Sequence, residues 1–454
     1  MSTVDIVNKI SALNNISDDY WDFRGAENSE RDFVHDFCAY PAMMVPKMQR
    51  ELLKVCIDEF DGRKISLLDP FAGSGTLLVE SMLAGIDATG IDINPLAVLL
   101  CKAKTTLIQQ NVLAQQSKTL LSCINDDNYE YSIHNFDGIN KWFTNQAINN
   151  LSKIRSAILC EQSVEIRRFF WAAFCEVVRI VSNSRHCTYK LHIKEKHDIA
   201  AYNKDALQIF SKVLLHNLDS LNLFYKELKN RKLITRNGSY KSSIKIYLGD
   251  TLEILKNQRK KYDLLFTSPP YGDNHTTVSY GQFSVLPLRW IKYDDVDERI
   301  DELLINTLSM IDRKSLGGKT AQANVTDEVK SIVNNSASLY EQIETIKSKD
   351  QTKVNKILLF YSDFDDALNI ISKKMKPDAY EVWTVGNRKV AKQEIYMHKI
   401  LENLNENYGF NLIINFNRNI CNKRMPEINA YKGSKEETIE TMTKEQILIF
   451  KRRR

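Results

Sequence analysis

Short apolar runs bounded by polar turn residues recur along this chain and predict buried β-strands. The clearest run spans residues 262–266 and leads into Thr-Ser-Pro-Pro-Tyr at 267–271. Further apolar runs lie at 65–69, 88–92, 244–250, 379–388, 410–416 and 445–450. Segments with apolar residues near helical spacing lie among them, at 47–60, 77–84, 361–375 and 393–404. This alternation predicts an α/β fold with a doubly wound, mostly parallel sheet.

Three stretches do not fit a minimal sheet. Residues 107–243 carry apolar stripes at helical spacing and predict a large helical insertion. Residues 292–355 predict a helical excursion from the edge that carries the proline-rich turn, suited to a lid or a target-reading element. Residues 1–36 are polar and predict a peripheral, weakly structured arm, with Trp21 as a docking point.

Composition narrows the class of protein. With 43% hydrophobic and 26% charged residues, the 454-residue chain is typical of soluble globular proteins. No apolar run approaches the roughly 20 residues that span a bilayer, and the start lacks a signal pattern, so we expect a cytoplasmic protein. The cysteines form no C-x-x-C pair, so neither a disulfide framework nor a metal site is expected. The net charge of +5 is compatible with a polyanionic partner without requiring one.

A glycine-rich turn follows the run at 65–69. It reads Gly73-Ser74-Gly75 and opens a predicted helix, where the backbone can approach a ligand closely and helix-end N–H groups face it. Asp92 ends the next apolar run, about 20 residues further on, the spacing at which a carboxylate accepts hydrogen bonds from ribose hydroxyls. This combination favours a nucleotide-like cofactor.

The proline-rich turn suits a planar amine. Two consecutive prolines fix φ and remove two backbone donors, which leaves carbonyl oxygens available as acceptors. Ser268 adds an acceptor, and Tyr271 offers a flat face on which a ring can stack. An ordinary strand-ending turn with a packing tyrosine would carry the same residues.

Taken together, Asp-Pro-Phe-Ala-Gly-Ser-Gly-Thr at 69–76, Gly-Ile-Asp at 90–92 and Thr-Ser-Pro-Pro-Tyr at 267–271 resemble the amino-group DNA methyltransferases of restriction-modification systems. The resemblance extends from about Phe37 to the C-terminus, with insertions. It implies a Rossmann-like methyltransferase sheet, S-adenosyl-L-methionine as cofactor, and double-stranded DNA from which the target base is flipped out. A restriction endonuclease encoded nearby is an implied partner.

The resemblance also implies roles for individual residues. Ser268, Pro269, Pro270 and Tyr271 would form the catalytic turn, while Asp92 would hold the ribose and Asp250 the adenine amine. The cofactor-binding set is Phe37, Ala39, Tyr40, Pro41, Asp69, Pro70, Phe71, Gly73, Ser74, Gly75, Thr76, Asp92, Ile93, Asp250 and Thr251. Weaker candidates for DNA contact are Arg185, Lys190, Asp273, His275, Arg418, Lys423 and Arg424, because basic stretches are also typical of solvated surfaces.

The target atom is less constrained than the reaction. Within the resembling family a serine at position 268 favours cytosine N4, whereas Asp or Asn there favours adenine N6. Methylation of cytosine C5 would need a cysteine after a proline, and no cysteine here follows one. Adenine N6 and RNA guanine N2 remain alternatives. A catalytically silent DNA-binding module is a further one, against which intact Ser268 and Tyr271 argue.

These inferences divide the chain into six segments. They are an arm (1–36), the first part of the cofactor-binding catalytic domain (37–106), the helical insertion (107–243), the catalytic segment with the proline-rich turn (244–291), the helical excursion (292–355) and the rest of the catalytic domain (356–454). The insertion lies between the second and third predicted strands, unlike the usual layouts of the family. Either the insertion or the excursion could therefore recognise the target sequence.

Overall fold

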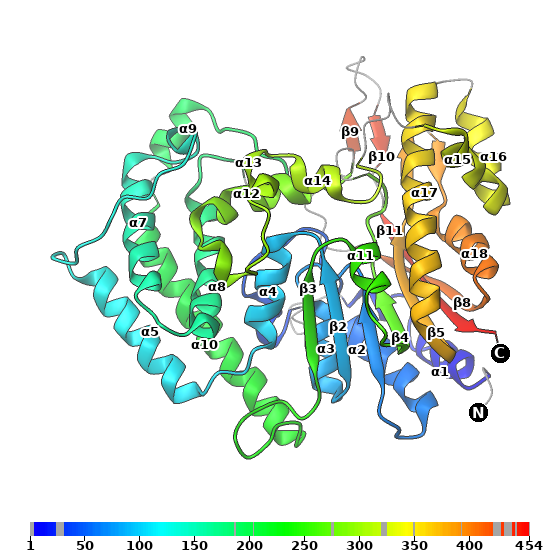
Figure 1. Ribbon diagram of the computed structural model, residues 1–454, viewed down its shortest axis with the longest axis horizontal. Helices are drawn as coiled ribbons and strands as arrows, with labels where there is room; N and C mark the ends of the chain where they lie inside the picture. Colours follow the sequence, from blue (N-terminus) through cyan, green and yellow to red (C-terminus); the bar gives the residue numbers. More distant parts are fainter. Residues whose placement is uncertain are drawn as a thin grey trace.

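The computed structural model describes residues 4–23, 31–185, 188–202, 204–273, 277–318, 325–347, 350–391, 393–420, 428–430, 438–440 and 443–453. Its centre is a seven-stranded sheet in the order β3-β2-β1-β4-β5-β11-β8 (Figure 1). The strands are β1 (Ser66–Asp69), β2 (Asp87–Asp92), β3 (Ile244–Leu248), β4 (Tyr262–Thr267), β5 (Met375–Gly386), β8 (Phe410–Asn419) and β11 (Lys444–Arg452). β11 runs antiparallel to its two neighbours, and the other pairings are parallel. The predicted α/β class with a mostly parallel sheet is confirmed.

Side chains alternate between the two faces of the sheet, as the pleat requires. Leu67 of β1 and Leu264 and Phe266 of β4 pack against one layer of helices, and Leu68 and Leu265 pack against the other. All five are fully buried. Because both faces are covered, these strands read as continuous apolar runs in the sequence.

The two helical layers come from different parts of the chain. One contains α1 (Val4–Asn14), α2 (Pro46–Ile57) and α3 (Thr76–Ala84). The other contains α11 (Thr251–Lys256), α16 (Ala337–Lys347), α17 (Gln351–Lys374) and α18 (Met397–Asn407). Among the described residues, no helix combines the length and the apolar character needed to cross a membrane.

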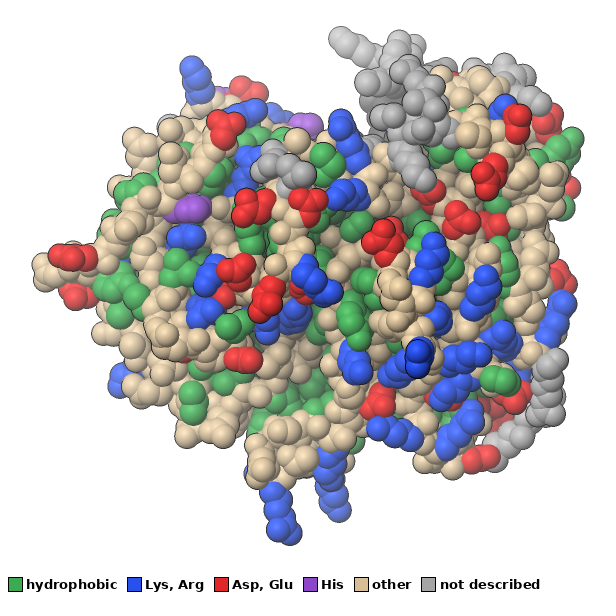
Figure 2. Space-filling view, in the orientation of Figure 1, with side chains coloured by type: hydrophobic (Ala, Val, Ile, Leu, Met, Phe, Trp, Pro, Cys, Tyr) green, Lys and Arg blue, Asp and Glu red, His purple; other side chains and the backbone are tan. Residues whose placement is uncertain are grey.

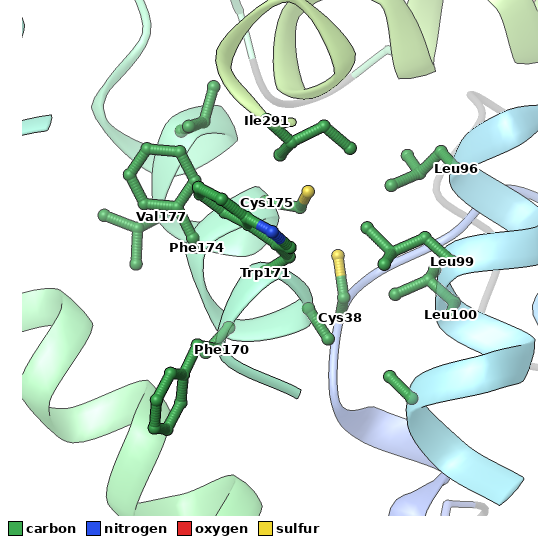
Figure 3. Close-up of a cluster of buried hydrophobic side chains, with 14 of the residues drawn as sticks. Cys38, Leu96, Leu99, Leu100, Phe170, Trp171, Phe174, Cys175, Val177 and Ile291 are labelled. Atoms are coloured by element: carbon green, nitrogen blue, oxygen red, sulfur yellow. The ribbon is translucent and has the colours of Figure 1, made fainter. Parts of the chain in front are cut away.

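The predicted helical insertion forms a bundle beside β3, on the left of Figure 1. Its helices include α5 (Gln110–Asn125), α7 (Asn145–Leu159), α8 (Val164–Val181) and α10 (Ala206–Asn230). α8 lies at the centre and packs against α7, α10 and also α4 (Pro95–Thr105), which adjoins β2 and β3. Figure 3 shows Trp171 and Cys175 of α8 facing Leu96 and Leu99 of α4, with Cys38 between the two helices. One continuous apolar core therefore joins the insertion to the sheet.

The excursion that follows β4 consists mostly of short helices. They include α13 (Leu303–Asn306), α14 (Met310–Lys314) and α15 (Asp327–Lys330), whereas α12 (Tyr280–Trp290) lies between β4 and the excursion. Asp295, which is buried, accepts hydrogen bonds from Arg167 and Trp171 of α8. The excursion is thereby fixed to the helical insertion.

Two local expectations were wrong. The arm was expected to be weakly structured, but Val4–Asn14 is a helix whose Ile6 and Ile10 are fully buried. The polar residues around its short apolar stripe conceal the helix in the sequence. The expected helix at 393–404 begins instead as β7 (Gln393–Ile395), which pairs with β6 (Arg388–Val390), and α18 starts only at Met397.

Candidate active site

The carboxyl ends of β1 to β4 border a cavity of about 660 Å³. Its lining contains most of the residues predicted to bind the cofactor or to form the catalytic turn. They are Tyr40, Pro41, Pro70, Phe71, Gly73, Ser74, Thr76, Asp92, Ile93, Asp250, Thr251, Ser268 and Pro270. In open α/β sheets ligands bind at this edge. Motifs nearly 200 residues apart in the chain thus meet at one cavity.

The remaining predicted site residues lie behind this lining. Phe37 is fully buried and packs edge-on against Phe169 of α8 at a centroid distance of 5.5 Å. Ala39 donates its backbone N–H to Glu176 at 2.8 Å. Both residues support the segment that carries Tyr40 and Pro41 into the cavity wall. Pro269 and Tyr271 of the proline-rich turn, together with Asp69 and Gly75, also lie outside the lining.

The glycine-rich loop is held by Asp92. One carboxylate oxygen accepts from the N–H of Gly73 and the other from the N–H of Asn94, each at 2.8 Å. Burial raises the pKa of Asp92 to about 6. Gly75 has φ +83°, and a Cβ there would lie 2.9 Å from Cys101 Sγ. The loop therefore requires glycine at 75 and an acceptor at 92.

Lys104 supports the same loop from inside the protein, a role that no sequence motif indicates. Its fully buried ammonium donates to the carbonyl oxygens of Ser74 at 3.0 Å and of His35 at 3.3 Å. Burial lowers the pKa of Lys104 to about 8. A lysine at the end of a helix usually reads as a solvated residue, so its loop contact could not be foreseen.

Asp69 connects the glycine-rich loop to the proline-rich turn. Its Oδ1 accepts from the Thr267 hydroxyl at 2.8 Å and from the N–H of Phe71 at 3.3 Å. Its Oδ2 has no hydrogen-bond partner among the described residues, although Asp69 is fully buried. This burial raises the pKa of Asp69 to about 7. Such an unpaired buried oxygen marks a place where a donor on a ligand would be accommodated.

The end of β3 supplies the third acidic residue. Asp250 caps α11 by accepting from the N–H groups of Leu252 and Glu253. The neighbouring Thr251 donates its hydroxyl to the carbonyl oxygen of Pro70 at 2.6 Å. This bond ties the loop after β3 to the loop after β1, so both border the same cavity.

The proline-rich turn has partners that the sequence did not suggest. Ser268 Oγ lies 3.1 Å from Tyr271 Oη, and Tyr271 donates to Glu445 Oε1 at 2.9 Å. Arg418, which is only 7% exposed, donates to Glu445 Oε2 at 2.8 Å. A buried guanidinium engaged in this way is not a surface phosphate contact, so the structure places Arg418 in the support of the turn.

The other weak candidates for DNA contact are dispersed. Arg185 is exposed and pairs with Glu195 at 3.5 Å, and Lys190 is also exposed. Asp273 is buried and pairs with Arg388 at 3.2 Å. His275, Lys423 and Arg424 lie outside the described residues. On the face seen in Figure 2, Lys and Arg side chains gather over the lower part of α17, away from the carboxyl ends of the strands.

The outer wall of the cavity comes from the excursion. The cavity lining includes Arg299, Leu304, Ile311, Lys314 and Leu316. The N–H of Gly281 donates to the buried Asp312 at 2.9 Å, which links α14 to the start of α12. Residues of the excursion thus form part of the cavity wall, and its role as a lid or a target-reading element stays a prediction.

One cluster has the spacing of metal ligands. Asp32, His35 and Glu80 bring their ligand atoms within 4.8 Å of one another. The Arg50 guanidinium, however, donates to both Asp32 and Glu80 at 2.7–3.0 Å. The arginine supplies the positive charge that a cation would bring, so the cluster is an internal ion pair.

The sheet order, the antiparallel β11 and the cavity at the carboxyl ends define a Rossmann-like methyltransferase fold. No family model matches the chain. The chain is 32% identical to Type II methyltransferase M.MvaI of Kocuria varians over 98% of its own length and 96% of that protein. It is also 32% identical over 100 residues to Type II methyltransferase M.MjaII of Methanocaldococcus jannaschii, covering 22% of this chain and 18% of that protein. The chain therefore belongs to the type II methyltransferases.

Proposed function

We propose that this protein is a site-specific DNA methyltransferase that transfers a methyl group from S-adenosyl-L-methionine to the N4 amine of a cytosine flipped out of duplex DNA. The observation that carries the proposal is the meeting of the glycine-rich loop with Ser268 and Pro270 at one cavity. Near-full-length likeness to a type II methyltransferase supports it. In a restriction-modification system such an enzyme protects cytoplasmic DNA from a partner endonuclease.

The residues around the cavity suit this cofactor. S-adenosyl-L-methionine supplies a methyl group on a sulfonium that is already activated for transfer. We assign the ribose hydroxyls to Asp92 and the adenine amine to Asp250, both of which line the cavity. We assign the cofactor's ammonium group to Asp69, whose Oδ2 is buried without a partner among the described residues.

The proline-rich turn would prepare the base amine. An exocyclic amine is a poor nucleophile because its lone pair is delocalised into the ring. If Ser268 Oγ and the Pro269 carbonyl accept its two hydrogens, the nitrogen becomes pyramidal and its lone pair can point at the methyl group. Each neutral hydrogen bond contributes about 1 kcal/mol net in water and more in a dry, preorganised site.

The base must also leave the DNA stack. Extruding a base costs a few kcal/mol. Stacking on the Tyr271 ring would offset part of this cost, since base–aromatic contacts contribute about 1–3 kcal/mol. Positioning of both reactants is thus the main contribution of the protein to the rate.

Methyl transfer from labelled S-adenosyl-L-methionine tests the proposal. The purified protein is incubated with mixed-sequence duplex DNA and, separately, with structured RNA, and the labelled nucleosides are then identified. We expect N4-methylcytosine in DNA only, and strongly reduced label with Ser268→Ala and Tyr271→Ala. Detection of N6-methyladenine would show that the target base is adenine and not cytosine. Label found only in RNA would overturn the DNA proposal. Equal label from the wild type and both variants would refute the assigned mechanism.

A further inference from the structure

Four side chains, from the turn after β4, from β11 and from β8, form a continuous chain of hydrogen bonds. It runs from Ser268 to Tyr271, from Tyr271 to Glu445 and from Glu445 to Arg418, with distances of 3.1, 2.9 and 2.8 Å. Ser268 lines the cavity, whereas Tyr271, Glu445 and Arg418 lie outside the lining. The chain therefore connects the turn to residues that do not themselves border the cavity.

The direction of β11 explains how Glu445 reaches the turn. β11 is antiparallel to both β5 and β8, so its first residues lie at the edge where the other strands end. Glu445 is in register with Gly386 at the end of β5 and with Arg418 near the end of β8. Since β5 also neighbours β4, this register sets Glu445 beside the turn that follows β4.

The hydrogen bonds in this chain have a defined direction. A guanidinium has only donors and a carboxylate paired with it has only acceptors, so the hydrogen between Tyr271 and Glu445 belongs to the tyrosine. Tyr271 Oη then offers only lone pairs to its other neighbour. The Ser268 hydroxyl must therefore donate its own hydrogen to Tyr271 Oη, which leaves its lone pairs free.

The protonation of Tyr271 agrees with this direction. Burial, together with the Glu445 carboxylate, raises its pKa well above the ordinary value for tyrosine. At neutral pH the phenol keeps its proton. Tyr271 therefore acts as a donor to Glu445 and does not take a proton from the base.

We propose that Glu445 is a positioning residue that, through Tyr271, fixes the Ser268 hydroxyl as an acceptor for the amine of the target base. The inference rests on the proposed methyl transfer and adds a requirement to it. An amine with two hydrogens needs acceptors, and a serine whose own hydrogen pointed at the amine would oppose its approach. Arg418 contributes by occupying the second carboxylate oxygen of Glu445, which fixes the orientation of that side chain.

The substitution Glu445→Gln should reverse the chain of hydrogen bonds. Arg418 would hold the amide oxygen, so the amide NH₂ would face Tyr271 and donate to its Oη. Tyr271 would then donate to Ser268, and the serine hydrogen would turn toward the base. Tyr271→Phe, in contrast, only releases Ser268 and keeps the stacking ring.

Single-turnover methyl transfer and steady-state kcat and KM for duplex DNA test this polarity. We expect kcat to fall about tenfold or more in Glu445→Gln, with a smaller fall in Tyr271→Phe and KM for DNA nearly unchanged in both. The double variant should recover to the level of Tyr271→Phe, because a reversed chain cannot reach Ser268 without the phenol hydroxyl. Fluorescence of 2-aminopurine at the target position should report the same base flipping in all four proteins.

A second tyrosine–carboxylate pair provides the matched control. Tyr380 of β5 donates to Glu59 at 3.3 Å, and neither residue belongs to the cavity lining. Tyr380→Phe and Glu59→Gln should keep kcat within about twofold of the wild type, since no acceptor at the base depends on them. Melting temperatures confirm that each variant is folded.

The outcomes separate the two proposals. A wild type that transfers no methyl group to DNA would overturn both. An active wild type with unchanged kcat in Glu445→Gln would overturn the role of Glu445 alone. Additive losses in the double variant, or losses seen only in KM, would also overturn it, because a merely structural contact behaves in that way.

Discussion

The two sides of the cavity are built in different ways. The glycine-rich loop is held by residues close to it in sequence: Asp92 binds the N–H of Gly73, 19 positions earlier, and that of Asn94, two positions later. The proline-rich turn is held from a distance, since Tyr271 binds Glu445, 174 positions further along the chain. The loop side is thus a local motif, whereas the turn side depends on correct assembly of the C-terminal strands.

We infer that the two sides differ in construction because they have different functions. A loop that binds a common cofactor can be specified by one short segment whose backbone does the binding. A turn that must orient one amine needs side chains at fixed angles, and the sheet supplies them through β8 and β11. Changes on the loop side should therefore affect cofactor affinity and local strain, while changes on the turn side should affect kcat.

The largest effect is expected at Gly75, which tests the local character of the loop side. Gly75→Ala combines a positive φ of +83° with a Cβ 2.9 Å from Cys101 Sγ. The free energy of unfolding should fall by about 2–5 kcal/mol, from left-handed backbone strain and overpacking. Chemical denaturation measures this change.

Gly62 is the matched control for Gly75. It has φ +72°, yet nothing lies within 4 Å of an added Cβ. Gly62→Ala should therefore cost only the backbone strain of about 1–2 kcal/mol. Equal losses in the two variants would show that the contact with Cys101 contributes nothing.

Asp92 gives the next largest effect. Asp92→Asn turns one of two acceptors into a donor that faces a backbone N–H, so the loop should loosen. Cofactor affinity, measured by calorimetry, should fall about 10–100-fold, as for a lost hydrogen bond to a charged group. Asp87→Asn, at the opposite end of β2, should leave that affinity unchanged. Unaltered binding by Asp92→Asn would contradict the assignment of the ribose side.

Asp69 joins the two sides of the cavity, and its raised pKa should make the stability of the fold depend on pH. Burial raises its pKa from 3.8 to about 7, so folding favours the protonated form. This contribution to stability is full below pH 3.8 and is lost as the pH rises through about 7. The ligand-free protein should therefore lose stability over this range, and Asp69→Asn should lose less. Thermal unfolding between pH 5 and about 8 measures the slope.

The ionisation of Asp69 should also make cofactor binding depend on pH. An ammonium group requires the carboxylate form, so affinity should rise with pH toward about 7, at most about tenfold per pH unit. Glu381 also has a pKa raised to about 7 by burial but does not line the cavity. Glu381→Gln should change how folding stability varies with pH and leave the pH dependence of cofactor affinity unchanged. A binding slope that persists in Asp69→Asn would contradict the role of Asp69.

The smallest effect is expected at Arg185, which belongs to neither side of the cavity. It is exposed and pairs only loosely with Glu195, at 3.5 Å. If Arg185 contacts phosphate, Arg185→Ala should weaken DNA binding by no more than about fivefold. The slope of the logarithm of DNA affinity against the logarithm of salt concentration should become smaller by about 1. Salt titrations of DNA binding measure both quantities. A loss that depends on the DNA sequence would instead make Arg185 part of target recognition.

Much of the fold was predictable because the central strands are buried on both faces and read as apolar runs. Most of the residues assigned to the cavity were also predictable, since Gly73, Asp92 and Ser268 lie in short motifs at the ends of such runs. Glu445 could not be foreseen, because it reaches the turn only through the antiparallel register of β11. Lys104 was hidden for a related reason: its contact with Ser74 depends on packing of α4 and not on spacing.

The N-terminal arm shows the same limit. Trp21 was a predicted docking point, and it packs on Phe416 of β8 at a centroid distance of 4.9 Å. Asp22 also accepts hydrogen bonds from Asn419 at the end of β8, 397 positions away. A docking residue was recognisable from its aromatic side chain, but the surface that receives it was not.

Base-resolution mapping of modified DNA tests the central claim most directly. Duplex DNA of random sequence is treated with the wild type, with Ser268→Ala and with the Tyr380→Phe control, and each methylated position is read out. We expect N4-methylcytosine within one recurring sequence for the wild type and the control, and a strong loss with Ser268→Ala. Unmodified DNA from the active, cofactor-binding wild type, or a pattern that Ser268→Ala leaves unchanged, would contradict it.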